Sequence, residues 1–123
     1  MSTSEGRYRG TKEYAFIYTE LIKAAKYRGT ITYQEIAKIV GLPMSGSHMG
    51  SEIGKILGEI SEDEVSNGRP MLSAIAVSVQ GTPGQGFFGL AKQLGKLNDG
   101  DNEDAFWQAE YQAVYETWKV VLK

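Results

Sequence analysis

The part of the sequence that most limits the possible folds is a pair of helices separated by a Gly-Leu-Pro break. Thr32 can accept a backbone N–H as the N-cap of a helix over residues 33–40, and the break at residues 41–43 ends that helix. A second helix is predicted to start after Ser45 or Ser47, because apolar residues recur there at helical spacing: Met49, Ile53, Ile56, Leu57 and Ile60. This order of elements is typical of a helix-turn-helix.

An apolar run and a glycine-rich loop follow the two helices. Residues 71–79 are built of Met, Leu, Ser, Ala, Ile and Val and are predicted to form a strand. Residues 81–86 read Gly-Thr-Pro-Gly-Gln-Gly, which is typical of a turn, and residues 87–94 return to apolar character, as a short strand leading into one or two helical turns. A strand and a β-hairpin after a helix-turn-helix indicate a winged helix, with the wing at residues 80–86. The acidic stretch over residues 61–67 is predicted to be a link.

Two further helices are expected to flank this unit. Thr11 precedes an amphipathic helix that is predicted to stop at Gly29. The last helix starts near Asn102 and carries an apolar stripe at alternating spacings of four and three residues: Trp107, Tyr111, Val114, Trp118 and Val121. This stripe either packs within the domain or forms the seam of a homodimer.

Length and composition limit the number of domains and the class of protein. A chain of 123 residues fits one domain, which we place over residues 11–123 after a flexible polar tail at residues 1–10. The tail contains Arg7, Tyr8 and Arg9, so it either increases solubility or acts as an arm that reaches along a nucleic acid. There is no cysteine, which excludes disulfides, thiolate metal sites and cysteine nucleophiles. No apolar run approaches the roughly 20 residues of a membrane helix, and no signal peptide is recognised, so we expect a cytoplasmic protein.

Charge is distributed unevenly along the chain. The net charge is −2, yet residues 1–58 carry eight bases and five acids, whereas residues 59–123 carry five bases and ten acids. The acidic total argues against strong non-specific binding to phosphate backbones. The basic first half can still present a local positive face.

Glycines recur every four residues along the second helix of the pair, at positions 46, 50, 54 and 58. Each glycine inside a helix costs roughly 1 kcal/mol relative to alanine. Such a stripe therefore indicates the close approach of another backbone, and we expect tight packing on a neighbouring helix more than a ligand.

The same region resembles a known family. The segment Gly29-Thr-Ile-Thr-Tyr-Gln-Glu-Ile-Ala-Lys-Ile-Val-Gly-Leu-Pro43, followed by Met49-Gly50, is similar to the C-terminal domain of the alkylguanine-DNA alkyltransferases and the alkyltransferase-like proteins. The likeness covers about 22 residues. It implies a winged helix that binds the minor groove and extrudes a base, with Tyr33 at the position of the tyrosine that helps to rotate the nucleotide. The arginine that this family inserts into the duplex is missing here, because Ser47 occupies its position and His48 follows.

The chain departs from this family downstream. Alkyltransferases carry Pro-Cys-His-Arg after a strand, whereas this chain reads Pro70-Met-Leu-Ser-Ala-Ile-Ala-Val-Ser-Val79. Alkyl transfer is excluded because no thiolate exists to accept the group.

Other chemistries find little support in the sequence. His48 is the only histidine, and nothing at helical or hairpin spacing completes a Ser/His/Asp arrangement. The acids of residues 59–64 are interpreted as solvated charge and not as a cation site. The glycine-rich loop lacks the Lys-Ser/Thr of a phosphate-binding loop. We therefore expect no enzyme, no cofactor and no metal.

These observations together predict an α+β, mostly α protein: a winged helix-turn-helix with flanking N- and C-terminal helices and a small β-hairpin. The function they favour is non-enzymatic binding of duplex DNA, in a regulatory or DNA-recognition accessory role. The alternative is a protein–protein interaction module, such as a phage-type or accessory regulator, that uses the same fold without nucleic acid. The residues expected to face DNA are Tyr33, Gln34, Ser45, Ser47, His48, Ser51, Lys55, Gln80, Thr82 and Gln85.

Overall fold

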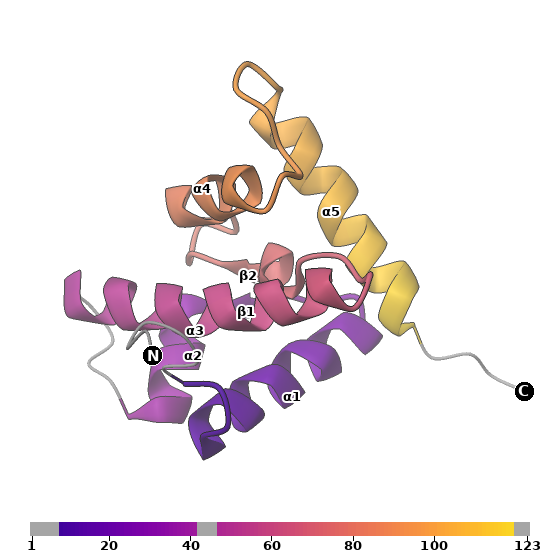
Figure 1. The fold of residues 1–123 in the computed structure, drawn as a ribbon. Helices are drawn as coiled ribbons and strands as arrows, with labels where there is room; N and C mark the ends of the chain where they lie inside the picture. Colours follow the sequence, from indigo (N-terminus) through magenta and orange to yellow (C-terminus); the bar gives the residue numbers. More distant parts are fainter. Residues whose placement is uncertain (1–7, 42–46, 120–123) are drawn as a thin grey trace, which may run out of the picture.

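The computed structural model describes residues 8–41 and 47–119, and these residues are mostly helical with one small sheet. In chain order the elements are α1 (Lys12–Lys26), β1 (Ile31–Thr32), α2 (Tyr33–Val40), α3 (Ser47–Ser66), the 3-10 helix η1 (Leu72–Ile75), β2 (Ala76–Val77), α4 (Gln85–Gln93) and α5 (Glu103–Trp118). Figure 1 shows α3 crossing the middle of the molecule, with α1 below it, β2 and α4 above it, and α5 running along one side.

The helices before the Gly-Leu-Pro break begin and end where local capping predicts. Thr11 Oγ1 accepts the N–H of Tyr14 at the start of α1. Thr32 and Glu35 form a reciprocal capping box at the start of α2, with N···O distances of 2.8 and 3.1 Å. Gly41 closes α2 in the left-handed conformation, at φ +75°. Both helices therefore confirm the sequence-based bounds to within a few residues.

The segment from Met71 to Val77 forms the centre of the core, because every residue in it is buried. Its 3-10 helix contacts α1, α3 and α5, so three helices enclose it. The prediction of a strand over residues 71–79 is wrong for most of that length. Only Ala76 and Val77 pair with β1, since packing against helices on several sides takes precedence over the β-propensity of the run.

The expected β-hairpin is also corrected by the structure. β1 and β2 pair in parallel, with Ile31 opposite Ala76 and Thr32 opposite Val77, and they form the one sheet of the described ranges. Residues 78–84 form a loop that leads directly into α4, so Phe87 and Leu90 lie on a helix and not on a returning strand. No wing of two antiparallel strands is present between residues 76 and 93.

The interpretation of residues 61–67 as a link is wrong as well. α3 continues through them to Ser66, and Ser61 and Glu64 are buried. The acids suggested solvent exposure, but several of them find partners on α1 and near the N-terminus, as described below.

Four residues of the α5 stripe, Trp107, Tyr111, Val114 and Trp118, pack in or against the core of the chain, while Val121 lies outside the described residues. Val114 and Tyr115 are buried, and the Trp107 Nε1–H donates to Ala74 O of η1 at 2.8 Å. The Tyr115 hydroxyl donates to Gly29 O at 2.9 Å beyond the end of α1. These contacts support the internal-packing interpretation of the stripe. Across residues 8–41 and 47–119, no helix has the length and apolarity needed to cross a bilayer.

Candidate functional site

A pocket of about 270 Å³ opens between the start of α2, residues 50–58 of α3, Ser73 of η1 and the start of α4. Its apolar wall includes Ile53, Leu57, Phe87 and Leu90. None of the described residues that line it carries a charge. The pocket is therefore suited to a neutral, apolar group and not to a phosphate.

The glycine stripe of α3 forms one side of this pocket. Gly50, Gly54 and Gly58 all line it, while Gly46 lies outside the described residues. A Cβ atom added at any of the three would meet no neighbouring atom within 4 Å. The expectation that these glycines pack tightly on a neighbouring helix is therefore wrong for the described part of the chain. They leave an open backbone surface beside the pocket.

Tyr33 stands at the opposite wall, as the first residue of α2. Its hydroxyl oxygen accepts the N–H of Gly84 at 2.7 Å and so joins α2 to the residue before α4. Burial raises the pKa of Tyr33, and the hydrogen bond from Gly84 opposes this shift in part. The phenol is therefore neutral at physiological pH. The neighbouring Gln34 is half-buried, and its Oε1 has no hydrogen-bond partner among the described residues.

Three other residues predicted to face DNA are exposed and adjacent in sequence to lining residues, although they do not line the pocket themselves. Ser51 and Lys55 are exposed on α3, each directly after a glycine that lines the pocket. The Lys55 Nζ also forms an ion pair with Glu52 at 2.9 Å. Gln85 is exposed at the start of α4, between the lining residues Gly84 and Gly86.

The remaining predicted residues are placed differently. Gln80 and Thr82 are exposed in the loop before α4 and do not line the pocket. Ser45 lies outside the described residues. Ser47 and His48 begin α3, but their side chains are outside the described part of the structure.

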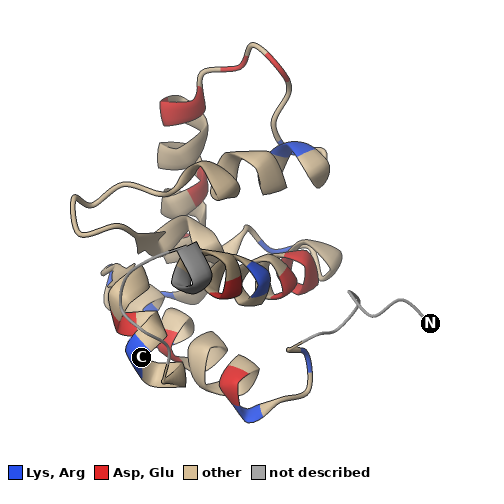
Figure 2. Ribbon diagram, turned by 90° about the vertical axis from the view of Figure 1, so that its left-hand side faces the viewer, with Lys and Arg blue, Asp and Glu red and all other residues tan. Residues whose placement is uncertain are grey.

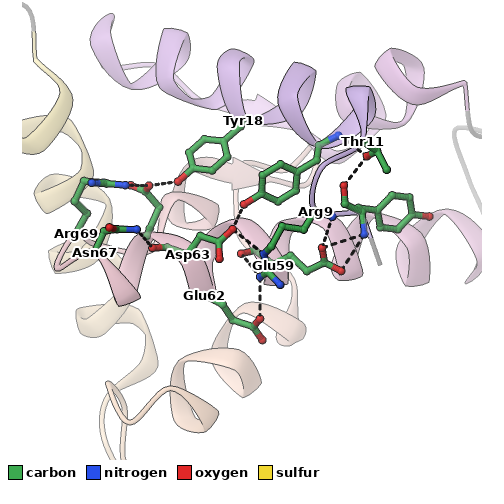
Figure 3. A network of polar contacts seen from close by, with 11 residues as sticks. Arg9, Thr11, Tyr18, Glu59, Glu62, Asp63, Asn67 and Arg69 are labelled. Carbon is green, nitrogen blue, oxygen red and sulfur yellow. Dashed lines mark hydrogen bonds and ion pairs between the residues drawn. The ribbon is translucent and has the colours of Figure 1, made fainter. Parts of the chain in front are cut away.

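The face of α3 turned away from the pocket carries acids that hold the N-terminal segment. Figure 2 shows acidic positions following one another along the second half of this helix. Glu59, which is 7 % exposed, accepts the backbone N–H groups of Tyr8 and Arg9 at 2.8–3.2 Å. The Arg9 guanidinium reaches Asp63 at 2.9 Å and Glu62 at 3.4 Å (Figure 3). Residues 8 and 9 are thus held against α3, and Arg9 is not available as an arm on nucleic acid.

A further acid of α3, Glu64, forms an ion pair with Arg69. Glu64 is fully buried and accepts two hydrogen bonds from Arg69, at 2.8 and 2.9 Å, and one from the Tyr18 hydroxyl (Figure 3). The Tyr14 hydroxyl likewise donates to Asp63. These acids are structural ties between α1 and α3. Among the described residues, no group of three or more His, Asp or Glu side chains is arranged to hold a metal ion.

The sequence identified Tyr33 but missed most of the pocket. Gly84, Phe87 and Leu90 belong to it because residues 85–93 form a helix whose first turn faces α2 and α3. The signal available was the apolar spacing of Phe87, Leu90 and Ala91, which fits a helix better than a strand.

Comparison with known proteins finds no matching family model, no similar curated protein and no similar solved structure at a significant level.

Proposed function

We propose that this protein binds duplex DNA without catalysing a reaction, and that the binding face surrounds the pocket between α2, α3 and α4. The observation that supports this most is the position of Tyr33. The residue that the alkyltransferase resemblance assigns to nucleotide rotation lines a neutral, apolar pocket, and Ser51, Lys55 and Gln85 are exposed around it.

The shape of the face suits a close approach of DNA. Gly50, Gly54 and Gly58 carry no side chains that would hold a duplex away from the α3 backbone. α4 begins beside the pocket without a side-chain cap. Gly84 N–H and Phe87 N–H donate within the chain, which leaves those of Gln85 and Gly86 for an acceptor such as a phosphate oxygen. The pocket itself offers an apolar space for one unstacked base. Chemistry on that base is not part of the proposal, because the chain has no thiol to accept an alkyl group.

The proposal is tested by fluorescence anisotropy with a labelled duplex over a range of salt concentrations. We expect a shallow salt dependence, with a slope of about −0.9 per phosphate contact, because Lys55 is the one cation among the residues predicted to form the face. A duplex containing 2-aminopurine should gain fluorescence on binding if a base leaves the stack.

A pair of glycine substitutions makes the test specific to the pocket. Gly54→Leu places a side chain on the pocket wall, and we expect at least about a tenfold loss of affinity. Gly89→Leu is the matched control, since Gly89 is also an exposed helical glycine with open space but does not line the pocket. No binding at low salt by the folded protein, or equal losses in the two variants, would contradict the proposal.

The second candidate function is a protein-interaction module. The observation that favours it is the combination of an acidic net charge with an open glycine surface on a helix, where another backbone can approach closely. Absence of DNA binding by the folded protein, together with a loss of partner binding in Gly54→Leu alone, would favour this function over the first.

A further inference from the structure

The loop between β2 and α4 is held together mainly by its own hydrogen bonds. Ser78 N donates to Thr82 O at 2.8 Å, Gly81 N donates to Ser78 O at 2.9 Å, and Gln80 N donates to Ser78 Oγ at 3.3 Å. Gly81 adopts a φ of +88°, which closes the turn. The loop is therefore a self-contained turn that does not need the rest of the domain to keep its shape.

A single hydrogen bond ties this turn to the body of the domain. In the described ranges, the bond from Gly84 N–H to the Tyr33 hydroxyl is the one that links residues 79–84 to α1, α2, α3 or η1. Apolar attachment is limited, because Val79 is 66 % exposed, Gln80, Gly81 and Thr82 are exposed, and Pro83 is half-buried.

The tied residue forms part of the pocket. Gly84 and Gly86 both line it, so a movement of the loop moves this wall. The Tyr33 ring lies directly against Gly84, where an added Cβ would be 3.5 Å from the hydroxyl oxygen. Tyr33 is in turn fixed at the start of α2 by the capping box of Thr32 and Glu35. One rigid element and one loosely attached loop thus meet at a single polar contact.

We propose that the Tyr33 hydroxyl is a latch that holds residues 79–84 closed against α2, so that access to the buried end of the pocket at Ser73 depends on breaking its hydrogen bond to Gly84. Tyr33 is a positioning residue in this proposal. The latch concerns the pocket proposed above to meet DNA, but it rests on that proposed function only for its consequence in DNA binding. A partner that accepts the Gly84 N–H or binds the Tyr33 hydroxyl would open the loop.

The absence of cysteine from the chain allows a direct test of pocket access. Ser73→Cys introduces one thiol at the buried end of the pocket, where Ser73 is also hydrogen-bonded to Ser61 of α3, and its rate of reaction with 4,4′-dithiodipyridine reports how often that end is exposed. In the Ser73→Cys background, Tyr33→Phe removes the latch but keeps the ring. We expect labelling about three- to tenfold faster, the range for one lost hydrogen bond. The Gly84 amide should exchange faster with solvent by a similar factor.

Tyr115→Phe is the matched control. It also removes a hydroxyl that bonds a backbone group, Gly29 O, but Tyr115 does not line the pocket. We expect unchanged labelling in this variant, and core amides should report any change in global stability. Gly84→Pro approaches the latch from the other side, because the φ of −76° is compatible with proline while the N–H donor is lost. It should also speed labelling.

The outcomes separate the latch from the proposed function. Equal labelling rates in the parent and Tyr33→Phe, or an equal increase in Tyr115→Phe, overturn the latch. If Tyr33→Phe does not fold, Gly84→Pro decides by the same criteria. Faster labelling with no DNA binding by the parent protein supports the latch while the DNA proposal fails. Labelling that stays equally slow in Tyr33→Phe, together with DNA binding by the parent protein, overturns the latch and supports the DNA proposal.

Discussion

Replacing Arg69 by methionine tests how much its ion pair with the buried Glu64, between α1 and α3, stabilises the fold. Arg69 donates two hydrogen bonds to Glu64, whose side chain is fully buried. Arg69→Met keeps much of the apolar stem of the side chain and removes the positive charge. The carboxylate of Glu64 is then left with the Tyr18 hydroxyl as its remaining donor.

The expected magnitude follows from burial on the two sides of the pair. Removing one partner of a buried ion pair destabilises a protein by about 3–5 kcal/mol, because the remaining charge is uncompensated. The Arg69 side chain is 35 % exposed, so water can reach part of the vacated space. We therefore expect a loss at the lower end of this range, about 3 kcal/mol of unfolding free energy.

Urea unfolding of the parent protein and three variants measures this loss and its cause. The double variant Glu64→Gln, Arg69→Met should recover most of the stability, since an amide is neutral and can still accept from Tyr18. Lys92→Met removes an ion pair with the highly exposed Asp99 and should change stability by less than about 0.5 kcal/mol. A single variant Arg69→Met that loses no more than Lys92→Met would refute the reasoning, and so would a double variant as unstable as the single one.

Two further predictions use other parts of the same helix pair. Gly54→Ala and the control Gly89→Ala should each raise the unfolding free energy by up to about 1 kcal/mol in urea unfolding, because neither added Cβ meets a neighbour; a destabilised Gly54→Ala would contradict the open surface. Burial, with a hydrogen bond to Glu64, raises the pKa of Tyr18 to about 12, whereas an unfolded tyrosine ionises near about pH 10. The unfolding free energy should fall as pH rises through this interval, because the unfolded state releases the tyrosine proton first. Unfolding curves at several pH values, together with phenolate absorbance, measure this fall. The Tyr18→Phe variant should show a smaller fall.

Local capping explains why the first helices could be predicted from the sequence. The start of α2 depends on Thr32 and Glu35, three residues apart, and its end depends on the left-handed Gly41. Each of these signals acts within one helical turn, so it is readable without the rest of the fold.

Contacts between distant residues explain where the prediction was wrong. The acids of residues 59–64 suggested a solvated link, but their partners are Arg9 and Tyr14, roughly fifty positions away in sequence, and Arg69 beyond the helix. The apolar run at residues 71–79 suggested a strand, but helices enclose it on several sides. Neither outcome has a local signal, because each depends on which segments meet in the core.

In the candidate site too, local signals were readable from the sequence and contacts between distant residues were not. Tyr33 was identified because it stands in a short, recognisable segment, and Gln85 because it stands in a glycine-rich loop. The positions of Gly84 and Phe87 in the pocket depend on how α4 packs against α2 and α3. No sequence pattern in residues 81–94 predicts that packing.

The two faces of α3 together explain why the glycine stripe is informative. One face is fixed to α1 and the N-terminal segment by Glu59, Asp63 and Glu64. The other face leaves Gly50 and Gly54 exposed beside the pocket, with no contact that an added Cβ would disturb. Glycine costs roughly 1 kcal/mol per helical position relative to alanine, and the packing of the described residues offers no compensation at either position. The compensation is therefore expected outside the described residues, in whatever approaches the backbone of α3 at the pocket.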